Sequence, residues 1–592
     1  MELRIKTLTP LHIGNGEKLS PLEYVIDGTT YYRLDQAAFT RFLKDLSPTA
    51  LRAFSDWVGE KYRAIADFEI SFSKLSRDQQ RDGKKDHNQQ FVALSQSATP
   101  LAFCESINKR AELIRFLREN KSLTRARIDA RDFKSSQVNE LQKNGLQKPY
   151  LPGSSIKGSI RTALLYNWLC HHADRKSVME AIDEQLRKKA KDTAMDDRLE
   201  AQAFYCEARI NGKVWHDEAQ YDLLKLLTVS DAHLAKDAFE LTLADVKAYV
   251  RKREKRGNKT EFIADEQRQT PYVEAIPAQT ELLGSLHFNI GFLYSIHEHL
   301  PADGKGIAIG GDYHWKYLKN KVKAVYNLDM DVFQGLNQLP TAERAKRLDE
   351  LEQQVLQHIM SCLKAFNQRQ LDSDRQWLDE FAKVDFKGHF ADRMEEGWAA
   401  LWPRRELPLL HLGFGAGFRS TTALLYFLED QGLQKKYEDI MQTFALGLPP
   451  NKKNDKKTRA DYVPKADKFP KSRRLVRTEQ AISPMGWLLI GEDIAPQQAS
   501  SASTSQAAQK ATPAAPEFHT GAINFKKPPI LDAVVTKSGS PNQVKVYYRP
   551  DDMPVLPLNG YRSALELNTV VQVQTVLNKK GQVVQVSFDR LK

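Results

Sequence analysis

The segment from Gln497 to Pro516 constrains the fold more than any other part of this sequence. It consists almost entirely of Gln, Ala, Ser, Thr and Pro. Such a composition buries too little apolar surface to offset the conformational entropy lost on folding, so we expect a flexible linker. The chain of 592 residues is therefore expected to hold a large unit before this linker and a separate small one after it.

Residues 517–592 are predicted to form the small unit, an all-β module. Alternating apolar and polar residues indicate four strands, and a short polar run indicates a hairpin turn. An OB-like barrel is the expected architecture. The strands are predicted at Ile530–Val535, Gln543–Tyr548, Val570–Leu577 and Val583–Phe588, with the turn at Asn578–Gly581.

Strand and helix patterns alternate throughout the first 496 residues, which predicts an α+β fold. Glu2–Leu8 alternates like a strand, and Asp27-Gly28 between two apolar runs is typical of a hairpin. Asp35 is placed to cap a helix, and Ala342–Phe366 has the apolar spacing of a long amphipathic helix. A buried strand is expected at Leu223–Val229.

The balance of charges favours a polyanionic partner. The chain has 87 Lys and Arg against 75 Asp and Glu, a formal net charge of +12. Its four cysteines are far apart, and no run is apolar enough for a signal peptide or a membrane span. We therefore expect a cytoplasmic protein without a disulfide framework, membrane contact, metal site or cofactor.

Two basic stretches receive different interpretations. Asn108–Lys134 has weak periodicity and is predicted to be a solvated basic excursion. Lys452–Arg477 has eleven Lys and Arg against three Asp and Glu, close to Tyr462, Phe469 and Trp487. Because bases stack on aromatic rings, RNA contact is favoured for the second stretch.

Gly153–Arg161, with the sequence GSSIKGSIR, leads into an apolar-periodic helix that we expect from about Ile156 to His171, so only Gly153–Ser155 lie before the helix. Ser154 or Ser155 is a plausible N-cap. Free N–H groups at the helix start, with Lys157 and Arg161 on one face, could cradle a phosphodiester. A plain helix cap with two solvated cations is the alternative, and it is the better one if the motif stands alone.

A second glycine-rich run, GFGAGFR at Gly413–Arg419, also precedes a predicted helix, at about Ser420–Leu428. It fits neither a Walker loop nor a Rossmann loop, because Phe418-Arg419 follows Gly417 where those loops require Lys-Ser/Thr or another glycine. We expect its glycines to need positive φ or a close approach to RNA.

These motifs resemble those of the RAMP superfamily, the repeat-associated RNA-binding proteins of CRISPR systems. GSSIKGSIR matches one motif of the superfamily, and GFGAGF resembles its glycine-rich loop. Other segments, in this order, resemble the Csm-five family of subunits of type III-A CRISPR effector complexes. They are Leu8–Gly16, Leu226–Asp231, Phe469–Arg474 and Met485–Trp487, so the resemblance spans about residues 1–495.

The resemblance implies two ferredoxin-like, RRM-related RAMP domains that bind CRISPR RNA (crRNA). The expected domains are 1–290 with helical and basic insertions, a helical insertion at 291–400, and 401–496. It implies a non-catalytic subunit that caps the 3′ end of crRNA and supports its maturation. Implied partners are crRNA, other effector subunits, especially the repeated backbone RAMP subunit, and a trimming nuclease of the host.

The expected RNA-contact residues come from all of these segments, and no catalytic residue is expected. They are His12, Gly14, Gly16, Gly153, Ser154, Ser155, Lys157, Gly158, Arg161, Gly413, Gly415, Gly417, Arg419, Lys471, Arg473 and Arg474.

Two alternatives stay open. The chain could be a metal-independent endoribonuclease of precursor crRNA, with His12 as the general base that deprotonates a 2′-hydroxyl. A structural or RNA-contacting His12 is favoured, because no motif links a second His or Tyr to it. The β-module could also be the functional end, an adaptor that recruits another protein or nucleic acid.

Overall fold

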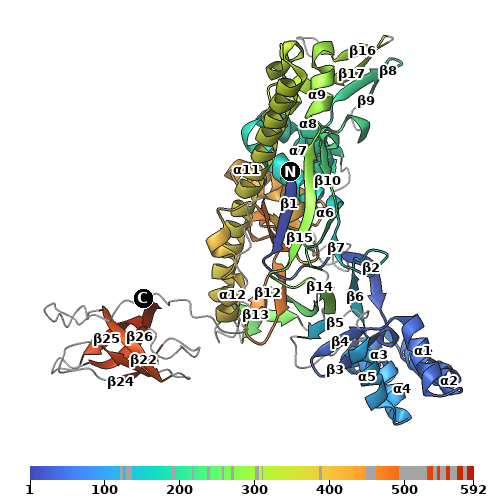
Figure 1. The fold of residues 1–592 in the computed structure, drawn as a ribbon. Coiled ribbons are helices and arrows are strands. Elements are labelled where there is room, and N and C mark those ends of the chain that lie inside the picture. Colours follow the sequence, from blue (N-terminus) through green and yellow to red (C-terminus); the bar gives the residue numbers. More distant parts are fainter. Residues whose placement is uncertain are drawn as a thin grey trace, which may run out of the picture. The chain divides into compact units, whose positions relative to one another are not determined.

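The structure is a computed structural model of the 592-residue chain. The described residues fall into two compact units, Met1–Gln497 and Gln498–Lys592 (Figure 1). The predicted linker lies outside the described residues. The structure describes residues 1–120, 125–128, 137–188, 194–215, 219–236, 240–256, 259–267, 272–300, 306–309, 311–385, 390–448, 461–491, 530–537, 543–546, 555–559, 570–577 and 583–591.

One sheet of the first unit joins the two ends of that unit. Its path runs β18-β21-β1-β15-β11-β7, with β10 also paired to β15. In β1, Leu3 and Ile5 are buried in alternation with more exposed residues, as the sequence pattern predicts. The strands are β1 (Glu2–Thr7), β7 (Tyr150–Leu151), β10 (Leu227–Val229), β11 (Ala232–Leu234), β15 (Glu281–Phe288), β18 (Leu409–His411) and β21 (Trp487–Gly491).

A second sheet follows the order β2-β6-β14-β12-β5-β4-β3, with β13 and β19 also paired to β12, and β20 to β19. The hairpin at Asp27-Gly28 is confirmed, since Asp27 faces Thr30 and Gly28 has φ +60°. The strands are β2 (Gly14–Leu19), β3 (Tyr24–Asp27), β4 (Thr30–Arg33), β5 (Arg125–Ile128), β6 (Val138–Leu141), β12 (Leu241–Arg256), β13 (Lys259–Gln267), β14 (Tyr272–Ala275), β19 (Ser472–Arg477) and β20 (Ile482–Ser483).

Strand pairing crosses the boundary expected between residues 1–290 and 401–496. β21 pairs with β1, and β19 pairs with β12. The chain therefore returns after residue 400 to complete sheets that its first 290 residues began. The mixed α+β fold class is confirmed, whereas the division into two ferredoxin-like domains stays a prediction.

The helix α11 (Thr341–Ala382) is longer than its sequence pattern predicts. It runs along one side of the first unit and packs against α6, β15 and β18 (Figure 1). Around it and the sheets lie the helices α6 (Gly153–His171), α7 (Arg175–Lys188), α8 (Ala194–Phe204), α9 (Ile290–Ile296), α10 (Leu318–Tyr326), α12 (Ala391–Trp398), α13 (Phe418–Thr421), α14 (Leu424–Phe427) and α15 (Gln431–Thr443). A small third sheet of this unit has the order β16 (Ile307–Ile309), β17 (Asp312–Lys316), β8 (Glu207–Ile210) and β9 (Lys213–Trp215).

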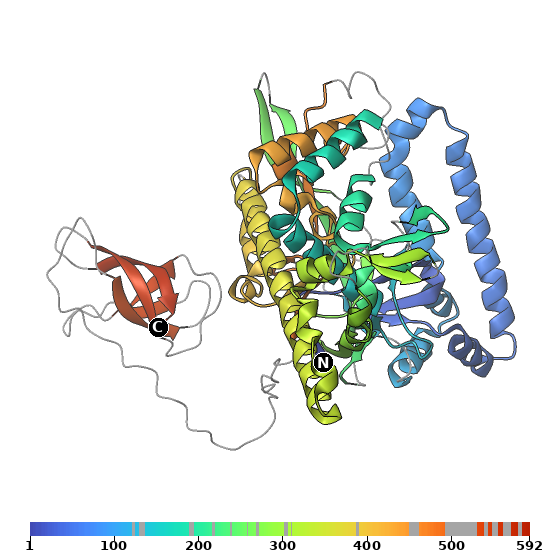
Figure 2. The same cartoon turned by 90° about the horizontal axis from the view of Figure 1, so that it is seen from above.

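An N-terminal group of helices follows the hairpin, and two of them form a long pair that is plain in Figure 2. Asp35 caps the first helix, accepting a hydrogen bond of 2.8 Å from the Ala37 amide, as predicted. The helices are α1 (Gln36–Leu46), α2 (Ala50–Ser73), α3 (Arg77–Ser97), α4 (Pro100–Ser106) and α5 (Arg110–Glu119).

Three local predictions were wrong. The supposed excursion at 108–134 contains α5, whose Leu113 and Leu117 are fully buried, and β5. The strand predicted at Leu223–Val229 starts as a 3₁₀ helix, because Asp222 accepts a hydrogen bond from the Leu224 amide. The helix predicted at 420–428 divides into α13 and α14. Other 3₁₀ helices are Pro21–Glu23, Ala219–Tyr221, His297–His299, Met330–Phe333, Leu336–Gln338, Trp402–Arg404 and Ala466–Lys468.

The second unit contains a closed barrel of five strands in the order β22-β23-β24-β26-β25. This agrees with the β-rich module that the strand pattern predicted. β24 was not predicted, because its Pro557 weakens the strand pattern. The predicted turn at Asn578–Gly581 lies outside the described residues. The strands are β22 (Ile530–Lys537), β23 (Gln543–Val546), β24 (Val555–Asn559), β25 (Val570–Leu577) and β26 (Val583–Leu591).

Candidate functional site

The glycine-rich loop packs directly on the opening loop that contains His12. The Phe414 amide donates a hydrogen bond of 2.8 Å to the His12 carbonyl oxygen. Gly413, Gly415 and Gly417 have φ values of +81°, +100° and +77°, so the predicted need for glycine is confirmed. A Cβ atom on Gly413 would lie 2.5 Å from the His12 carbonyl oxygen. At Gly413 the close approach is therefore to the protein backbone.

His12 is buried within this junction, with 3% of its surface exposed. Its Nδ1 lies 2.6 Å from the carbonyl oxygen of Glu274, and its ring meets Phe414 edge-on at 5.7 Å. Burial lowers the pKa of His12 below its ordinary value, more than the nearby Glu274 raises it. The imidazole is thus held neutral and engaged with the protein, while Gly14 and Gly16 beside it are exposed.

Glu274 is the charged centre beneath the opening loop, and it is fully buried. Its carboxylate accepts hydrogen bonds from Lys143 Nζ at 2.6 Å, the Tyr31 hydroxyl at 2.9 Å and the Leu141 amide at 3.2 Å. These contacts join β14, β6 and β4 and satisfy the buried charge. Glu274 was not predicted from the sequence, because its partners come from distant segments.

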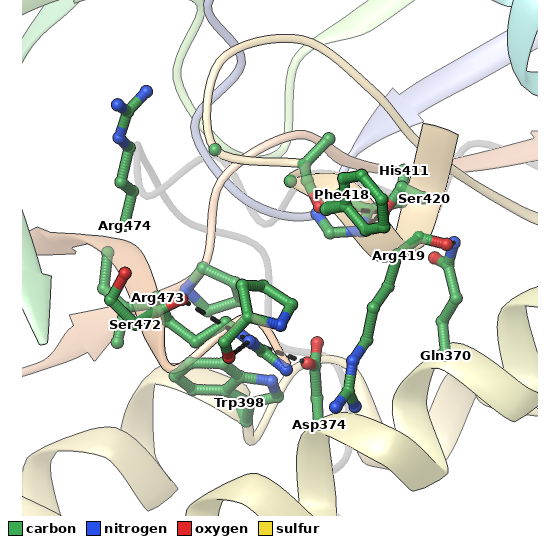
Figure 3. A pocket seen from close by; sticks show the side chains of 16 residues that line it. Gln370, Asp374, Trp398, His411, Phe418, Arg419, Ser420, Ser472, Arg473 and Arg474 are labelled. Carbon is green, nitrogen blue, oxygen red and sulfur yellow. Dashed lines mark hydrogen bonds and ion pairs between the residues drawn. The ribbon is translucent and has the colours of Figure 1, made fainter. Parts of the chain in front are cut away.

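A cavity of about 200 Å³ lies beside the glycine-rich loop. Gly415, Gly417, Arg419 and the Arg473-Arg474 pair of β19 all contribute to its lining. Residues predicted from two separate motifs are therefore brought together here. Figure 3 shows Arg419 and Arg473 directed toward Asp374, whereas Arg474 points away from them.

Arg419 is a buried cation, 7% exposed, and not the surface contact that its motif predicted. Its guanidinium donates hydrogen bonds of 2.8 Å to the carbonyl oxygens of Phe469 and Asp467. Burial, together with the like charge of Arg473, lowers the pKa of Arg419 to about 9. Arg473 donates from Nε to Asp374 at 3.1 Å, whereas Arg419 has no carboxylate within 4.0 Å among the described residues.

Two predicted cations, Lys471 just before β19 and Arg474 within it, are exposed and lie over aromatic rings. The Arg474 guanidinium lies 4.9 Å from the centre of the Phe414 ring, and Lys471 Nζ lies 6.0 Å from that of Tyr462. Within the described part of the chain, neither cation has a carboxylate within 4.0 Å. Both charges remain available to a ligand.

The start of α6 is built differently from the expected phosphate cradle. The helix begins at Gly153 with Pro152 as its N-cap, so Ser154 and Ser155 lie in its first turn. The Gly153 amide donates a hydrogen bond of 2.8 Å to a carboxylate oxygen of Asp231. The Asp231 carboxylate therefore already occupies part of the helix start. A Cβ on Gly153 would also collide with the Val229 carbonyl oxygen.

Arg161 is engaged inside the protein, which corrects its assignment as a phosphate contact. It donates from Nε to Glu200 at 2.6 Å and from Nη1 to Asp222 at 2.7 Å. Although burial lowers the pKa of Arg161, these two carboxylates raise it above its ordinary value. Lys157 is half-buried with no ion pair among the described residues, and Gly158 is exposed.

Comparison with known proteins identifies the family. The model of the RAMP superfamily matches residues 4–311, more than half of the chain. The chain belongs to the RAMP superfamily. A curated relative, the CRISPR system Cms protein Csm5 of Streptococcus thermophilus, is 26% identical over 165 residues. That match spans 28% of this chain and 37% of the relative's length.

Solved structures also resemble this RAMP protein. A chain in the cryo-EM structure of a Csm–crRNA–target RNA ternary complex of a type III-A CRISPR-Cas system has 19% identity and a TM-score of 0.47. The match covers 83% of this chain and all of that one. The crystal structure of T. onnurineus Csm5 has 18% identity and a TM-score of 0.42, with 82% and 99% covered.

The helix α6, which begins with the GSSIKGSIR motif, packs against α13, whose first residue is the Phe418 that ends the GFGAGF run. The loops and the basic strand of this RAMP protein were predicted from the sequence, whereas Asp374, Gln370 and Trp398, which also line the cavity, were not. They lie on α11 and α12, whose patterns indicate only core packing.

The described residues contain neither a metal-binding cluster nor a membrane-spanning helix. In these parts of the RAMP chain, no group of three or more His, Cys, Asp or Glu could hold a metal ion. None of the described helices is both long and apolar enough to cross a membrane.

Proposed function

We propose that this RAMP protein is a non-catalytic, RNA-binding subunit of a type III-A CRISPR effector complex that caps the 3′ end of crRNA and supports its maturation. The observation that carries the proposal is the pair of exposed cations, Arg474 over Phe414 of the glycine-rich loop and Lys471 over Tyr462. Cations with aromatic faces suit a single-stranded polyanion. The curated relative named Csm5 supports the assignment to this type of complex.

The surroundings of His12 favour binding over catalysis. A general base must reach the 2′-hydroxyl proton of its substrate. His12 is buried, and its Nδ1 contacts a backbone carbonyl oxygen at 2.6 Å. The endoribonuclease hypothesis is tested with purified protein and labelled precursor crRNA. We expect no multiple-turnover cleavage, and cleavage that is lost in His12→Ala would overturn the proposal.

RNA binding itself is tested with the full chain and a labelled single-stranded RNA. Arg474→Gln should weaken binding about fivefold and reduce the slope of log K against log salt by about 0.7, the value for one phosphate contact on a single strand. Arg52→Gln removes the same charge from an exposed site on α2 and should change neither quantity. Equal effects of the two variants would contradict a local RNA site.

Position in the complex requires a different experiment. Co-expression with the other effector subunits should yield a complex that contains this chain and crRNA. A photoreactive nucleotide at the 3′ end of the guide should crosslink to this chain, and one at the 5′ end should not. Crosslinking from the 5′ end alone would refute the capping role while leaving RNA binding intact.

A further inference from the structure

The cavity beside the glycine-rich loop has flat apolar walls. Trp398, Phe418, Pro470 and Pro484 line it, together with the polar residues of α11 and β19 (Figure 3). Flat apolar walls suit a planar ring, which gains contact area on both faces. A phosphate group is strongly hydrated and has no apolar face to offer such walls.

Three polar atoms of this lining are buried without a hydrogen-bond partner among the described residues. They are Nε1 of Trp398, Nη2 of Arg473 and Oε1 of Gln370. The Trp398 and Gln370 residues are 1% and 3% exposed. Unpaired buried polar atoms are costly, so they are expected to have a partner in the working state. Two donors and one acceptor are present.

The charges of the cavity lining also favour a planar ring with polar atoms at its edge. Arg473 is paired with Asp374, whereas Arg419 donates to backbone carbonyl oxygens and has no carboxylate within 4.0 Å in the described part of the chain. The lining therefore carries an excess of positive charge. Electron-rich ring nitrogens and carbonyl oxygens are attracted to such surroundings.

The mouth of the cavity connects it to the proposed RNA surface. Gly417 and Arg474 are exposed at this edge, and Arg474 points away from the interior (Figure 3). A nucleotide whose phosphate contacts Arg474 would have its base close to the opening. Bases splayed out of a single strand are the usual targets of sequence-specific RNA recognition.

We propose that this cavity receives one unstacked nucleobase of the bound RNA, held between Trp398 and Phe418 and read at its edge by Arg473 and Gln370. This inference rests on the proposed RNA-binding function and deepens it. It makes the protein a reader of one base position, in addition to a binder of the backbone.

An abasic scan tests the proposal. The full chain is titrated with single-stranded RNAs of about 12 nucleotides, each with one base removed at a different position. One position should weaken binding about tenfold, the size expected for loss of a stacked base, and the others less than twofold. If the RNA binds with its usual salt dependence but every abasic position is equivalent, the base pocket is wrong while RNA binding stands. If no RNA binds, the proposed function itself fails.

A matched pair of variants places the sensitive base in the cavity. Gln370→Met should weaken binding of the intact RNA about fivefold, and it should have no further effect once the sensitive base is absent. Gln368→Met, on the same helix but partly exposed, should leave binding unchanged. If Gln370→Met weakens intact and abasic RNAs equally, the cavity contacts the backbone and the proposal is overturned.

Photocrosslinking keeps the test independent of any variant that fails to fold. A 5-iodouridine at the sensitive position of the RNA is irradiated with the wild-type chain. Mass spectrometry should find the crosslink on the peptide containing Trp398 or Phe418. A crosslink confined to other peptides would overturn the proposal.

Discussion

The backbone amide of Phe414 donates its hydrogen bond to the carbonyl oxygen of His12. This bond joins the glycine-rich loop to the opening loop that contains His12. The glycines around this contact therefore serve two needs. Gly413 allows the two backbones to approach, while Gly415 and Gly417 turn the loop toward the cavity. The structural role therefore belongs to Gly413, and the role in contacting a ligand belongs to Gly415 and Gly417.

Gly413→Ala is expected to destabilise the protein more than Gly417→Ala. Both positions have positive φ, which costs an L-residue about 1–2 kcal/mol. Only at Gly413 would the added Cβ also collide with the His12 carbonyl oxygen, whereas at Gly417 its nearest neighbour would be 3.7 Å away. The free energy of unfolding, measured with denaturant, decides this prediction. Equal losses would contradict the packing argument.

Arg161→Ala should act on stability. The guanidinium bridges Glu200 and Asp222, and its removal leaves two carboxylates without their cation. We expect a loss of about 2 kcal/mol, less than for a fully buried pair because the side chain is 20% exposed. Arg52→Ala, at an exposed position, should cost much less. Thermal unfolding of the two variants provides the comparison.

Lys157→Met should act on RNA binding. This half-buried ammonium has no ion pair in the described part of the chain, and burial lowers its pKa from the ordinary value. If it contacts a phosphate, the salt slope falls by about 0.7 in the variant. Lys176→Met on α7 is the control. An unchanged slope for both would show that the start of α6 is a plain helix cap.

His411 predicts a pH dependence of stability. It is buried against Trp487, and burial lowers its pKa to about 4 from 6.5. Between these values the unfolded chain binds the proton and the folded one does not, so stability present above pH 6.5 is lost as the pH falls toward 4. The lowered pKa of His411 contributes in full about 3 kcal/mol to the free energy of unfolding.

The contribution of His411 is isolated by comparing how steeply the unfolding free energy changes with pH in three proteins. Over the same pH range, His411→Gln should reduce the dependence of the unfolding free energy on pH. His233→Gln, at an exposed position, should leave that dependence as it is in the wild type. A slope that is the same in all three proteins would mean that other groups cause the acid sensitivity.

Truncation after residue 497 should leave the first unit folded. The boundary between the two compact units falls after Gln497 in the chain, and the composition of 497–516 predicts a linker. We expect the 1–497 fragment to unfold at the same temperature as the first transition of the full chain. A large decrease would mean that the barrel stabilises the first unit. Pull-down with the fragment and the full chain then tests the adaptor role of the β-module.

Local sequence was sufficient to predict the elements whose causes are local. The alternation in β1, the hairpin at Asp27-Gly28, the cap at Asp35 and the β-rich module all depend on neighbouring residues. The positive φ expected of Gly413, Gly415 and Gly417 is also confirmed, because few other residues adopt that conformation.

Only the tertiary structure decided which cations are available to a ligand. Arg161, Arg419 and Arg474 belong to similar basic motifs, yet the first is neutralised by two carboxylates, the second is buried, and the third is exposed over Phe414. Their partners come from segments far away in the chain, so the surrounding sequence does not reveal them. Burial and ion pairing depend on which distant residues the fold brings within a few ångströms, and this is why the sequence by itself determined the motifs but not the site.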